Sequence, residues 1–279
     1  MNKIRTPDQV IINGKKLSYL IEEHQKWVDQ PSDENEKYRL NLSNQNLSYI
    51  SFNLCNLKGI ILTNCNLENS LFIETILSVA ELTGSSFNNA IFCNCTMIDT
   101  FFQYCKFDNA KFIEQNNITN SDFTGIDDSK CEFLHNYPYI FPTEGEFIAW
   151  KKIYTVTESV NIKHIKDKYI VKLLIPEDAK KLSSTSNHAR CDKAKVLEIY
   201  PMVSIDSDTY NNIDPINESI HAATNVVVKL PNGAYKRKFV YTTYTPGEMV
   251  YPDKFDPDRW DDCSNGIHFF MNINDAIQF

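Results

Sequence analysis

The chain has 279 residues, of which 42% are hydrophobic and 12% aromatic, enough for the packed cores of two ordinary domains. Its net charge is -8, and segment 40–127 carries three basic and eight acidic residues, so the basic surplus that nucleic-acid binding requires is missing. No apolar run approaches the length of a membrane helix, and Lys3, Arg5 and Asp8 interrupt the region where a signal peptide would need apolar residues. We therefore expect neither nucleic acid nor membrane as a partner, and a cytoplasmic location.

Residues 1–38 predict a hairpin followed by a helix. The hairpin signal is the Asn13-Gly14 pair in VIINGKKL. In the next stretch, LSYLIEEHQKWV at 17–28, apolar residues share one helical face, and Ser18 is the expected N-cap. This helix is predicted to cap the repeats that follow, and His24 on its apolar face is expected to pack there without a catalytic role.

From residue 42 onward a large apolar residue recurs at every fifth position. Steps of five from Leu42 meet Leu, Phe or Met at fifteen consecutive positions, the last being Phe112. Two positions before most of them stands a small residue, such as Ala80. The register then slips by one residue and resumes at Ile118 and Phe123.

A period of five fits neither an α-helix nor a plain strand. It indicates a chain that turns a corner every five residues, with one large and one small side chain inward and three outward. The outward positions are mostly Asn, Ser and Thr. Four of the eight cysteines, at positions 55, 65, 95 and 105, belong to the small series, so we predict buried, reduced thiols there.

The segments CNLKG, CNLEN, SSFNN and CKFDN resemble the pentapeptide-repeat family, over roughly residues 39–126. The resemblance implies a right-handed four-sided β-helix. No convergent set of acids, bases or phosphate-binding residues lies along the repeats, so a binding surface is expected there and not an active site. The expected domains are therefore an N-terminal cap at 1–38, the repeat β-helix at 39–127, a linker at 128–144 and a further domain at 145–279.

Residues 145–279 alternate short apolar runs with turns. GEFIAWKKIYTVT, KYIVKLLIP, AKVLEIYPMV, NVVVKL, KRKFVYTTYTPGEMVYP and GIHFFM predict strands, EDAKKL a short helical turn, and NINDAIQF a helix with Asn274 as N-cap. The fold class predicted for the whole chain is mainly β, with a small α+β domain built on an antiparallel sheet at its end.

This second half also resembles an uncharacterised domain that follows pentapeptide repeats in phage, bacterial and giant-virus proteins. The matching stretches include IVKLLIPEDAKKLSS, RCDKAKVLEI and PDKFDPDRWDDCSNGIHFF. Segment 201–238 departs from that pattern and is expected to be an enlarged loop. The resemblance implies architecture and no particular activity.

Three groups of residues invite a chemical interpretation. Cys263 and His268 are a possible nucleophile pair, but five positions apart on a strand they face opposite sides, so no catalytic residue is predicted. His188, Cys191, Cys263 and His268 have zinc-like local spacing, although the favoured prediction is no metal. GIHFF with Ala276 is similar to a strand of diphtheria-toxin-like ADP-ribosyltransferases, and Arg190 would match their first-strand basic residue, yet no catalytic Glu is found.

We predict a non-catalytic scaffold that binds an unidentified protein, with the repeat rod positioning the C-terminal domain as the recognition part. Gly, with 8 residues, is too scarce for phosphate-binding loops, so no cofactor is predicted. The oligomeric state stays open. Aromatic–cation pairs and irregular segments supply the predicted binding residues, which are Trp150, Lys151, Lys152, Arg190, Arg259, Trp260 and His268.

Three alternatives stay open. The resemblance and the Asn-, Ile- and Lys-rich composition suggest a structural component of a phage or giant-virus particle, located in the host cytoplasm or the virion. An enzyme in the C-terminal domain, with the ADP-ribosyltransferase fold as the specific candidate, is the second. A DNA-mimicking topoisomerase inhibitor, as some pentapeptide-repeat proteins are, is the third, although those are longer acidic dimers.

Overall fold

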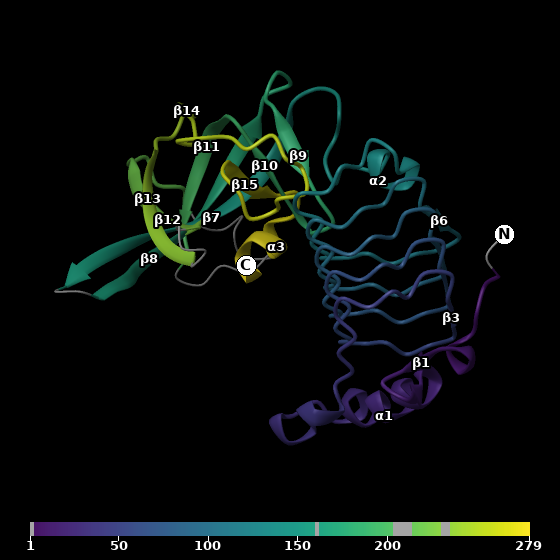
Figure 1. Cartoon of the computed structure of the whole chain (residues 1–279). Coiled ribbons are helices and arrows are strands. Elements are labelled where there is room, and N and C mark those ends of the chain that lie inside the picture. Colours follow the sequence, from purple (N-terminus) through teal and green to yellow (C-terminus); the bar gives the residue numbers. More distant parts are fainter. Residues whose placement is uncertain (1–2, 160–161, 203–213, 230–234) are drawn as a thin grey trace. The chain divides into compact units, whose positions relative to one another are not determined.

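The computed structural model describes residues 3–159, 162–202, 214–229 and 235–279, and it divides the chain into two compact units (Figure 1). Unit 1 is Met1–Pro138 and unit 2 is Tyr139–Phe279. The segment expected as a linker, 128–144, is thus shared between the two units. Among the described helices, none is long and apolar enough to cross a membrane.

Unit 1 begins with a small cap. The predicted hairpin is confirmed, because Ile11 and Ile12 pair antiparallel with Lys16 and Lys15. The prediction that Ser18 is the N-cap was wrong. The helix begins at Leu17, its N-cap residue is Lys16, and the Ser18 hydroxyl donates a hydrogen bond to Asp8. The cap elements are η1 (Pro7–Gln9), β1 (Ile11–Ile12), β2 (Lys15–Lys16), α1 (Leu17–Asp29) and η2 (Asp33–Tyr38).

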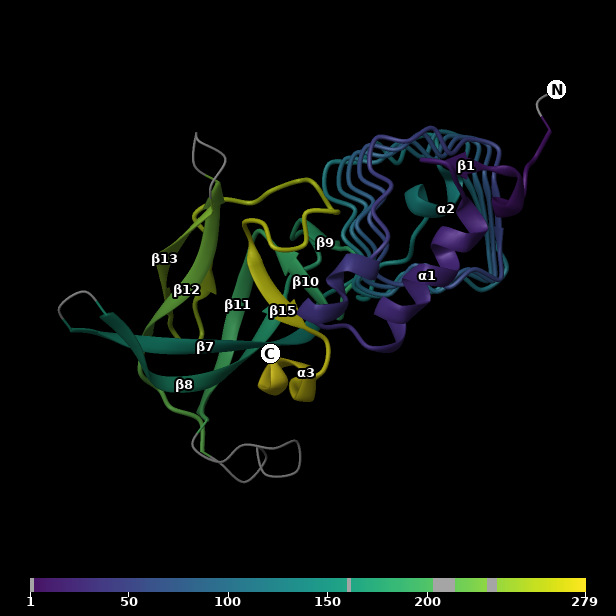
Figure 2. The ribbon, with the colours of Figure 1, turned by 60° about the horizontal axis from the view of Figure 1, so that its bottom comes forward.

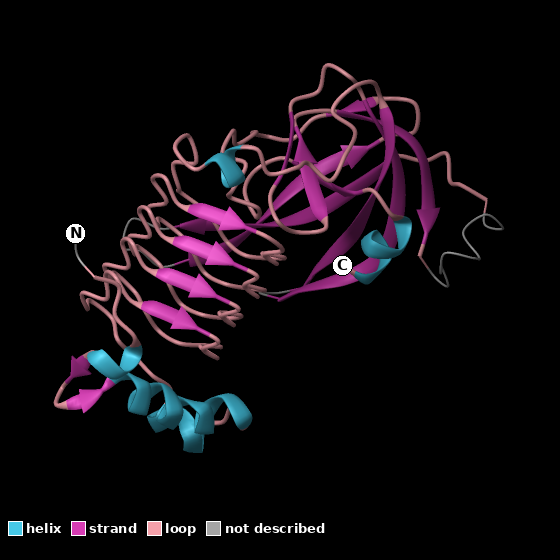
Figure 3. Ribbon diagram, turned by 90° about the vertical axis from the view of Figure 1, so that its right-hand side faces the viewer, coloured by secondary structure: helices cyan, strands magenta, loops and turns pink. Residues whose placement is uncertain are grey.

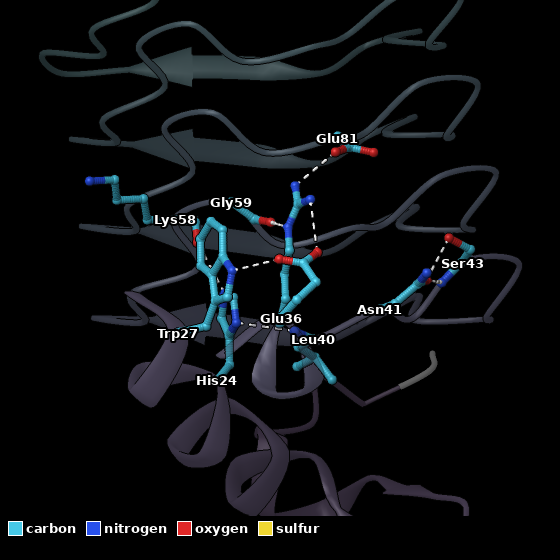
Figure 4. Close-up of polar contacts among 10 residues, drawn as sticks. His24, Trp27, Glu36, Leu40, Asn41, Ser43, Lys58, Gly59 and Glu81 are labelled. Carbon is cyan, nitrogen blue, oxygen red and sulfur yellow. Dashed lines mark hydrogen bonds and ion pairs between the residues drawn. The ribbon is translucent and has the colours of Figure 1, made fainter. Parts of the chain in front are cut away.

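Helix α1 is fixed to the first coil through His24 and Trp27 (Figure 4). The Leu40 amide donates to His24 Nδ1 at 3.1 Å, so Nε2 carries the proton and donates to the Lys58 carbonyl at 3.0 Å. Trp27 lies so close to Gly59 that a Cβ there would stand 2.3 Å from the indole. His24 is therefore a packing residue, as predicted, and burial lowers its pKa.

The repeats stack in coils of twenty residues, which is four five-residue segments per coil. On one face of the stack the segments are the parallel strands β3 (Ser51–Asn53), β4 (Leu71–Ile73), β5 (Ile91–Cys93) and β6 (Lys111–Ile113), each displaced by twenty residues from the last (Figure 3). Isolated parallel bridges with the same displacement mark other faces. Viewed along the stack, the coils superimpose (Figure 2).

Large side chains fill the interior of the stack, as the period of five predicts. The rings of Phe52, Phe72, Phe92 and Phe112 stack one above another, with centroids 5.2, 4.8 and 4.7 Å apart. The short helix α2 (Glu132–His135), which the sequence did not predict, extends the column by placing Phe133 4.7 Å from Phe112. Helix α2 thereby covers this aromatic column at its far end.

The small residues that stand two positions before each large one have a second role, which their small volume alone did not predict. Where the residue is Cys, Ser or Thr, its side chain donates to the carbonyl of the large residue one coil below. Cys65 donates to Leu42 at 3.0 Å, and Thr100 donates to Leu77 at 2.8 Å. Cysteines 65, 95 and 105 are buried as predicted, whereas Cys55 is partly exposed because it stands at the first coil.

The residue two places after each large one has a positive φ. This left-handed conformation suits Asn, Asp and Gly, which explains why Asn is concentrated in the repeats. Other residue types hold the same conformation at a few coils, among them Leu54 with φ 56° and Val79 with φ 54°.

The predicted slip of register occurs at one corner of the fourth coil. Bridges between repeats before it join residues twenty apart, and after it Thr96 pairs with Asn117 and Phe101 with Asp122, which are twenty-one apart. The Asn116 side chain accepts from the Cys95 amide at 3.0 Å and donates to the Ile113 carbonyl at 2.8 Å. An amide side chain thus supplies hydrogen bonds beside the extra residue.

Unit 2 contains a sheet whose paired strands are all antiparallel in the described residues. The order is β14-β11-β8-β7-β15-β10-β9, and β12 pairs with both β13 and β7. The elements are β7 (Phe147–Ser159), β8 (Ile162–Ile175), β9 (Lys181–Ser183), β10 (His188–Cys191), β11 (Ala194–Pro201), β12 (Ile220–Lys229), β13 (Tyr235–Tyr244), β14 (Met249–Val250), β15 (Ile267–Phe270) and α3 (Ile273–Gln278).

The mainly β fold class is confirmed, and several local predictions in unit 2 need correction. The helical turn expected at EDAKKL is a turn that leads into β9. The N-cap of α3 is Asn272, whose side chain accepts from the Asn274 amide at 2.7 Å. The enlarged loop expected at 201–238 contains β12 and the start of β13, while 203–213 and 230–234 lie outside the described residues.

Candidate functional site

The predicted binding residues of unit 2 gather around three neighbouring strands. Trp150 on β7 lies opposite Phe270 on β15, and His268 on β15 lies opposite Arg190 on β10. The fold therefore places Trp150, Arg190 and His268 on one face of the sheet, whereas Lys151, next to Trp150 on β7, points to the opposite face.

Most of these side chains lie inside the unit. Trp150 and Lys151 are each 8% exposed, Arg190 is 2% exposed and Trp260 is 3% exposed. All four side chains are therefore buried in the free chain. Their binding role stays a prediction, and their position favours the other interpretation of aromatic–cation pairs, packing at a core edge.

Each predicted cation donates to backbone carbonyls of its own unit. Lys151 Nζ donates to His268 at 3.1 Å, and Lys152 Nζ donates to Ile277 at 2.9 Å. Arg259 Nη2 donates to Ser183 at 2.9 Å. These hydrogen bonds connect segments that are far apart in the sequence. Each one also gives a backbone carbonyl the hydrogen-bond donor that it needs inside the domain.

Arg190 anchors the loop between β14 and β15. Its guanidinium donates to the carbonyls of Asp256, Asp258 and Asn265 and lies 5.5 Å from the ring of Phe255. Burial lowers the pKa of Arg190, while Asp256 and its acidic neighbours act in the opposite direction. The register places Arg190 opposite His268 in the GIHFF strand, but the loop occupies its guanidinium.

The zinc-like set does not converge. His188 and His268 lie on one face of the sheet with ring centroids 5.4 Å apart, whereas Cys191, three positions after His188, points to the opposite face and donates to the Ile267 carbonyl. Cys263 is exposed. Among the residues that the structure describes, no group of three or more His, Cys, Asp or Glu could hold a metal ion.

Two basic groups in this region have strongly lowered pKa values. Burial lowers the pKa of Lys151 to about 8. Burial, followed by the charge of Lys151, lowers the pKa of His268 to about 3, although its Nε2 donates to the Ser264 carbonyl at 2.7 Å. His188 and Arg190 act on His268 in the same direction as Lys151. The interior of unit 2 therefore disfavours additional positive charge.

A different surface of unit 1 was missed by the sequence interpretation. We call it the apolar strip and define it as the outward side chains of Leu71, Ile73, Ile91, Cys93 and Ile113. These residues flank the inward Phe of β4, β5 and β6 in the segments LFI, IFC and KFI. The apolar residues on both sides of an inward Phe could have predicted this surface from the sequence. Leu71, Ile73, Ile91 and Cys93 are partly exposed, and Ile113 is 44% exposed.

The strip contrasts with the face that precedes it in each coil. There the corresponding outward residues are Asn66, Glu68, Ser86 and Asn88. The prediction that outward positions are mostly polar is therefore correct for that face and wrong for β4 and β5. Next to β6 the surface has a hollow of 660 Å³, whose lining includes Ile113, Phe133 and Tyr137.

Charged residues border the strip on one side. The corner column that follows β3–β6 consists of Leu54, Glu74, Asn94 and Glu114, whereas the column before these strands is Tyr49, Asn69, Asn89 and Asn109. Glu74 and Glu114 are exposed and form no ion pair within the described part of the chain.

The solved structures that are similar to the chain include pentapeptide repeat proteins. One from the cyanobacterium Cyanothece 51142 is 24% identical, with 31% of this chain and 58% of that chain covered and a TM-score of 0.21. One from the Arabidopsis thaliana thylakoid lumen is 21% identical, with 38% and 81% covered and a TM-score of 0.20. The chain thus spans 58% of the length of the first of these relatives. No curated protein matches the chain.

Two family models match the chain. One, described as pentapeptide repeats (8 copies), matches residues 50–89 and 75–112. The other, described as a family of unknown function (DUF5758), matches residues 137–276, which is just over half of the chain. The chain therefore belongs to the DUF5758 family, and pentapeptide repeats precede that family's domain.

Proposed function

We propose that this chain is a non-catalytic protein-interaction scaffold, in which a right-handed four-sided β-helix carries a binding surface and holds unit 2 for a second contact. The observation that carries the proposal is the apolar strip. Exposed apolar groups that are contiguous on a rigid support are typical of protein-binding sites. The support here is rigid because parallel backbone pairing and stacked Phe rings hold β4, β5 and β6 together.

Two matched variants test the proposal. Ile91 lies in the strip, and Ile61 is an outward, partly exposed Ile on another face of the stack. A photo-crosslinking residue in place of Ile91, in cells that express the full chain, should capture one discrete protein that the same residue in place of Ile61 does not. The captured protein, once purified, should bind the wild-type chain at least about 10-fold more tightly than the Ile91→Asp variant.

The same experiment defines failure of the proposal. Identical capture patterns from positions 91 and 61 would contradict a specific binding role for the strip. So would equal affinity of the purified partner for wild-type chain and Ile91→Asp, provided that both remain folded by circular dichroism.

A second candidate contact lies on unit 2. Tyr241 and Met249 are each 38% exposed and Tyr251 is 59% exposed, and they line a hollow of 340 Å³. Exposed Tyr and Met are enriched at protein interfaces, which supports a recognition role for this part of unit 2. Tyr251→Ala should weaken binding of the captured partner, and unchanged affinity would confine the contact to unit 1.

A further inference from the structure

The class of partner can be inferred from the dimensions of the apolar strip. Three residues of a strand extend about 10 Å, and the step from β4 to β6 is two strand spacings, or about 10 Å. The flat area is thus on the order of 100–200 Å², well below the roughly 800 Å² per partner of a standard protein interface. A second copy packed face to face on this strip would bury too little surface for a stable dimer.

The spacing of the strip matches an α-helix that runs along the stack. Successive coils are about 4.8 Å apart, and successive turns of an α-helix are about 5.4 Å apart. A helix lying across β4, β5 and β6 therefore presents about one turn to each coil. Its apolar residues at positions i, i+4 and i+7 would meet the rows containing Leu71, Ile91 and Ile113 in turn.

The charged residues beside the apolar strip determine which flank of a bound helix faces which side of the strip. Glu74 and Glu114 stand two coils apart on the same corner column, which is about 10 Å, close to the distance between helical positions i and i+7. The opposite flank carries Asn69, Asn89 and Asn109, which are neutral. Lys111 is exposed at the end of the strip nearest the hollow.

We propose that the apolar strip binds one amphipathic α-helix of a partner protein, lying along the stack with two basic side chains, seven residues apart, over Glu74 and Glu114. This inference rests on the proposed interaction function and specifies the partner's recognition element. The apolar contacts supply the affinity, and the glutamates select the charge of one flank.

The test uses two labelled peptides and the full chain. Each peptide is Ala-rich, about 14 residues long, with Leu at i, i+4 and i+7. One carries two Lys residues seven positions apart beside the Leu stripe, and the other carries Glu at the same positions. Fluorescence anisotropy at low ionic strength should show the Lys peptide binding at least about 10-fold more tightly than the Glu peptide.

Three variants locate the binding. Ile91→Asp should weaken the Lys peptide about 10-fold or more, and the matched Ile61→Asp should leave its affinity unchanged. The double variant Glu74→Lys/Glu114→Lys should reverse the preference between the two peptides, a result that a folding defect cannot produce. Thermal unfolding of each variant verifies the fold.

Several outcomes would overturn the inference. No binding of either peptide, equal effects of Ile91→Asp and Ile61→Asp, or an unreversed charge preference would each exclude a basic amphipathic helix. A wild-type dimer in sedimentation that Ile91→Asp converts to a monomer would identify a second copy as the occupant instead. If the captured partner still depends on Ile91 while the peptides fail, the proposed function stands and only the helix inference falls.

Discussion

Some residues at the corners of the repeats have a strained backbone conformation, which the five-residue pattern of inward side chains does not reveal. The left-handed position occurs once per five residues, and Asn or Gly holds it at most corners. At Val79, with φ 54°, a β-branched side chain holds it instead, which is unusual for this residue type. The packing of the stack therefore compensates for local strain at this corner.

Val79→Asn should stabilise unit 1. Relief of the left-handed penalty contributes about 1 kcal/mol, which corresponds to a rise of about 2–4 °C in the thermal midpoint. The reverse substitution, Asn69→Val, should lower the midpoint by a similar amount. Calorimetry of the full chain measures both, and a lower midpoint for Val79→Asn would show that the lost apolar contacts outweigh the strain.

The thiols should fall into two classes of reactivity. Burial raises the pKa of Cys65, Cys95 and Cys105, the last to about 12, so little reactive thiolate forms at neutral pH. Cys263 is exposed. A thiol reagent followed by peptide mass spectrometry should label Cys263 rapidly in the native chain, and the three coil thiols only in denaturant. Rapid native labelling of Cys95 would contradict its inward position.

At the scale of elements, the repeats were predictable because their pattern is local and strictly periodic. Four five-residue segments make one coil, so each inward Leu or Phe lies directly above the inward residue twenty positions earlier. The five-residue spacing therefore predicts which residues stack. Helix α2 was not predicted, because a four-residue helix leaves no periodic signal. Strand β10 was likewise missed, since its residues HARC alternate in no simple apolar pattern and are all buried.

The binding residues were less predictable than the fold for a physical reason. Arg and Lys beside aromatic residues have the composition of an interface, but the same side chains also satisfy backbone carbonyls inside a domain. The choice depends on long-range partners: Lys151 meets His268, and Arg190 meets Asp256 and Asn265. No local window of sequence contains both members of these pairs.

Arg190→Gln should loosen the loop between β14 and β15. The substitution leaves the carbonyls of Asp256 and Asp258 without their charged donor, so the loop should open locally while the sheet remains folded. Trypsin should then cleave after Lys254 and Arg259 at least about 10-fold faster than in the wild-type chain. Lys193→Gln is the matched control, because Lys193 forms an exposed ion pair with Asp178. Equal cleavage rates in both variants would exclude an anchoring role for Arg190.

At the scale of the whole molecule, the two units differ in what they bury. The stack buries neutral hydroxyls, thiols and rings, whereas unit 2 buries the basic side chains of Lys151 on β7 and Arg190 on β10, next to the partly buried His268 on β15. Buried cations make the stability of unit 2 dependent on pH.

Acid should destabilise unit 2 partly through His268. Its pKa is about 3 when folded and 6.5 as the ordinary value, so the unfolded chain binds the extra proton between these limits. The unfolding free energy should therefore fall as pH decreases from 6.5 towards 3, by up to about 1.4 kcal/mol per pH unit from this residue. His268→Gln should flatten the profile in denaturant titrations; an unchanged slope would show that carboxylates alone cause it.

The corner at Asn116 has a consequence for how such a chain can vary over generations. One added residue there displaces the later coils by a single position and leaves the inward columns intact, as Ile118 and Phe123 remain buried. A single-codon insertion at a corner is thus absorbed where it occurs. Gain or loss of a whole twenty-residue coil would similarly preserve every neighbouring contact. The gene can therefore gain or lose whole coils one at a time, because each coil contacts only the coils next to it.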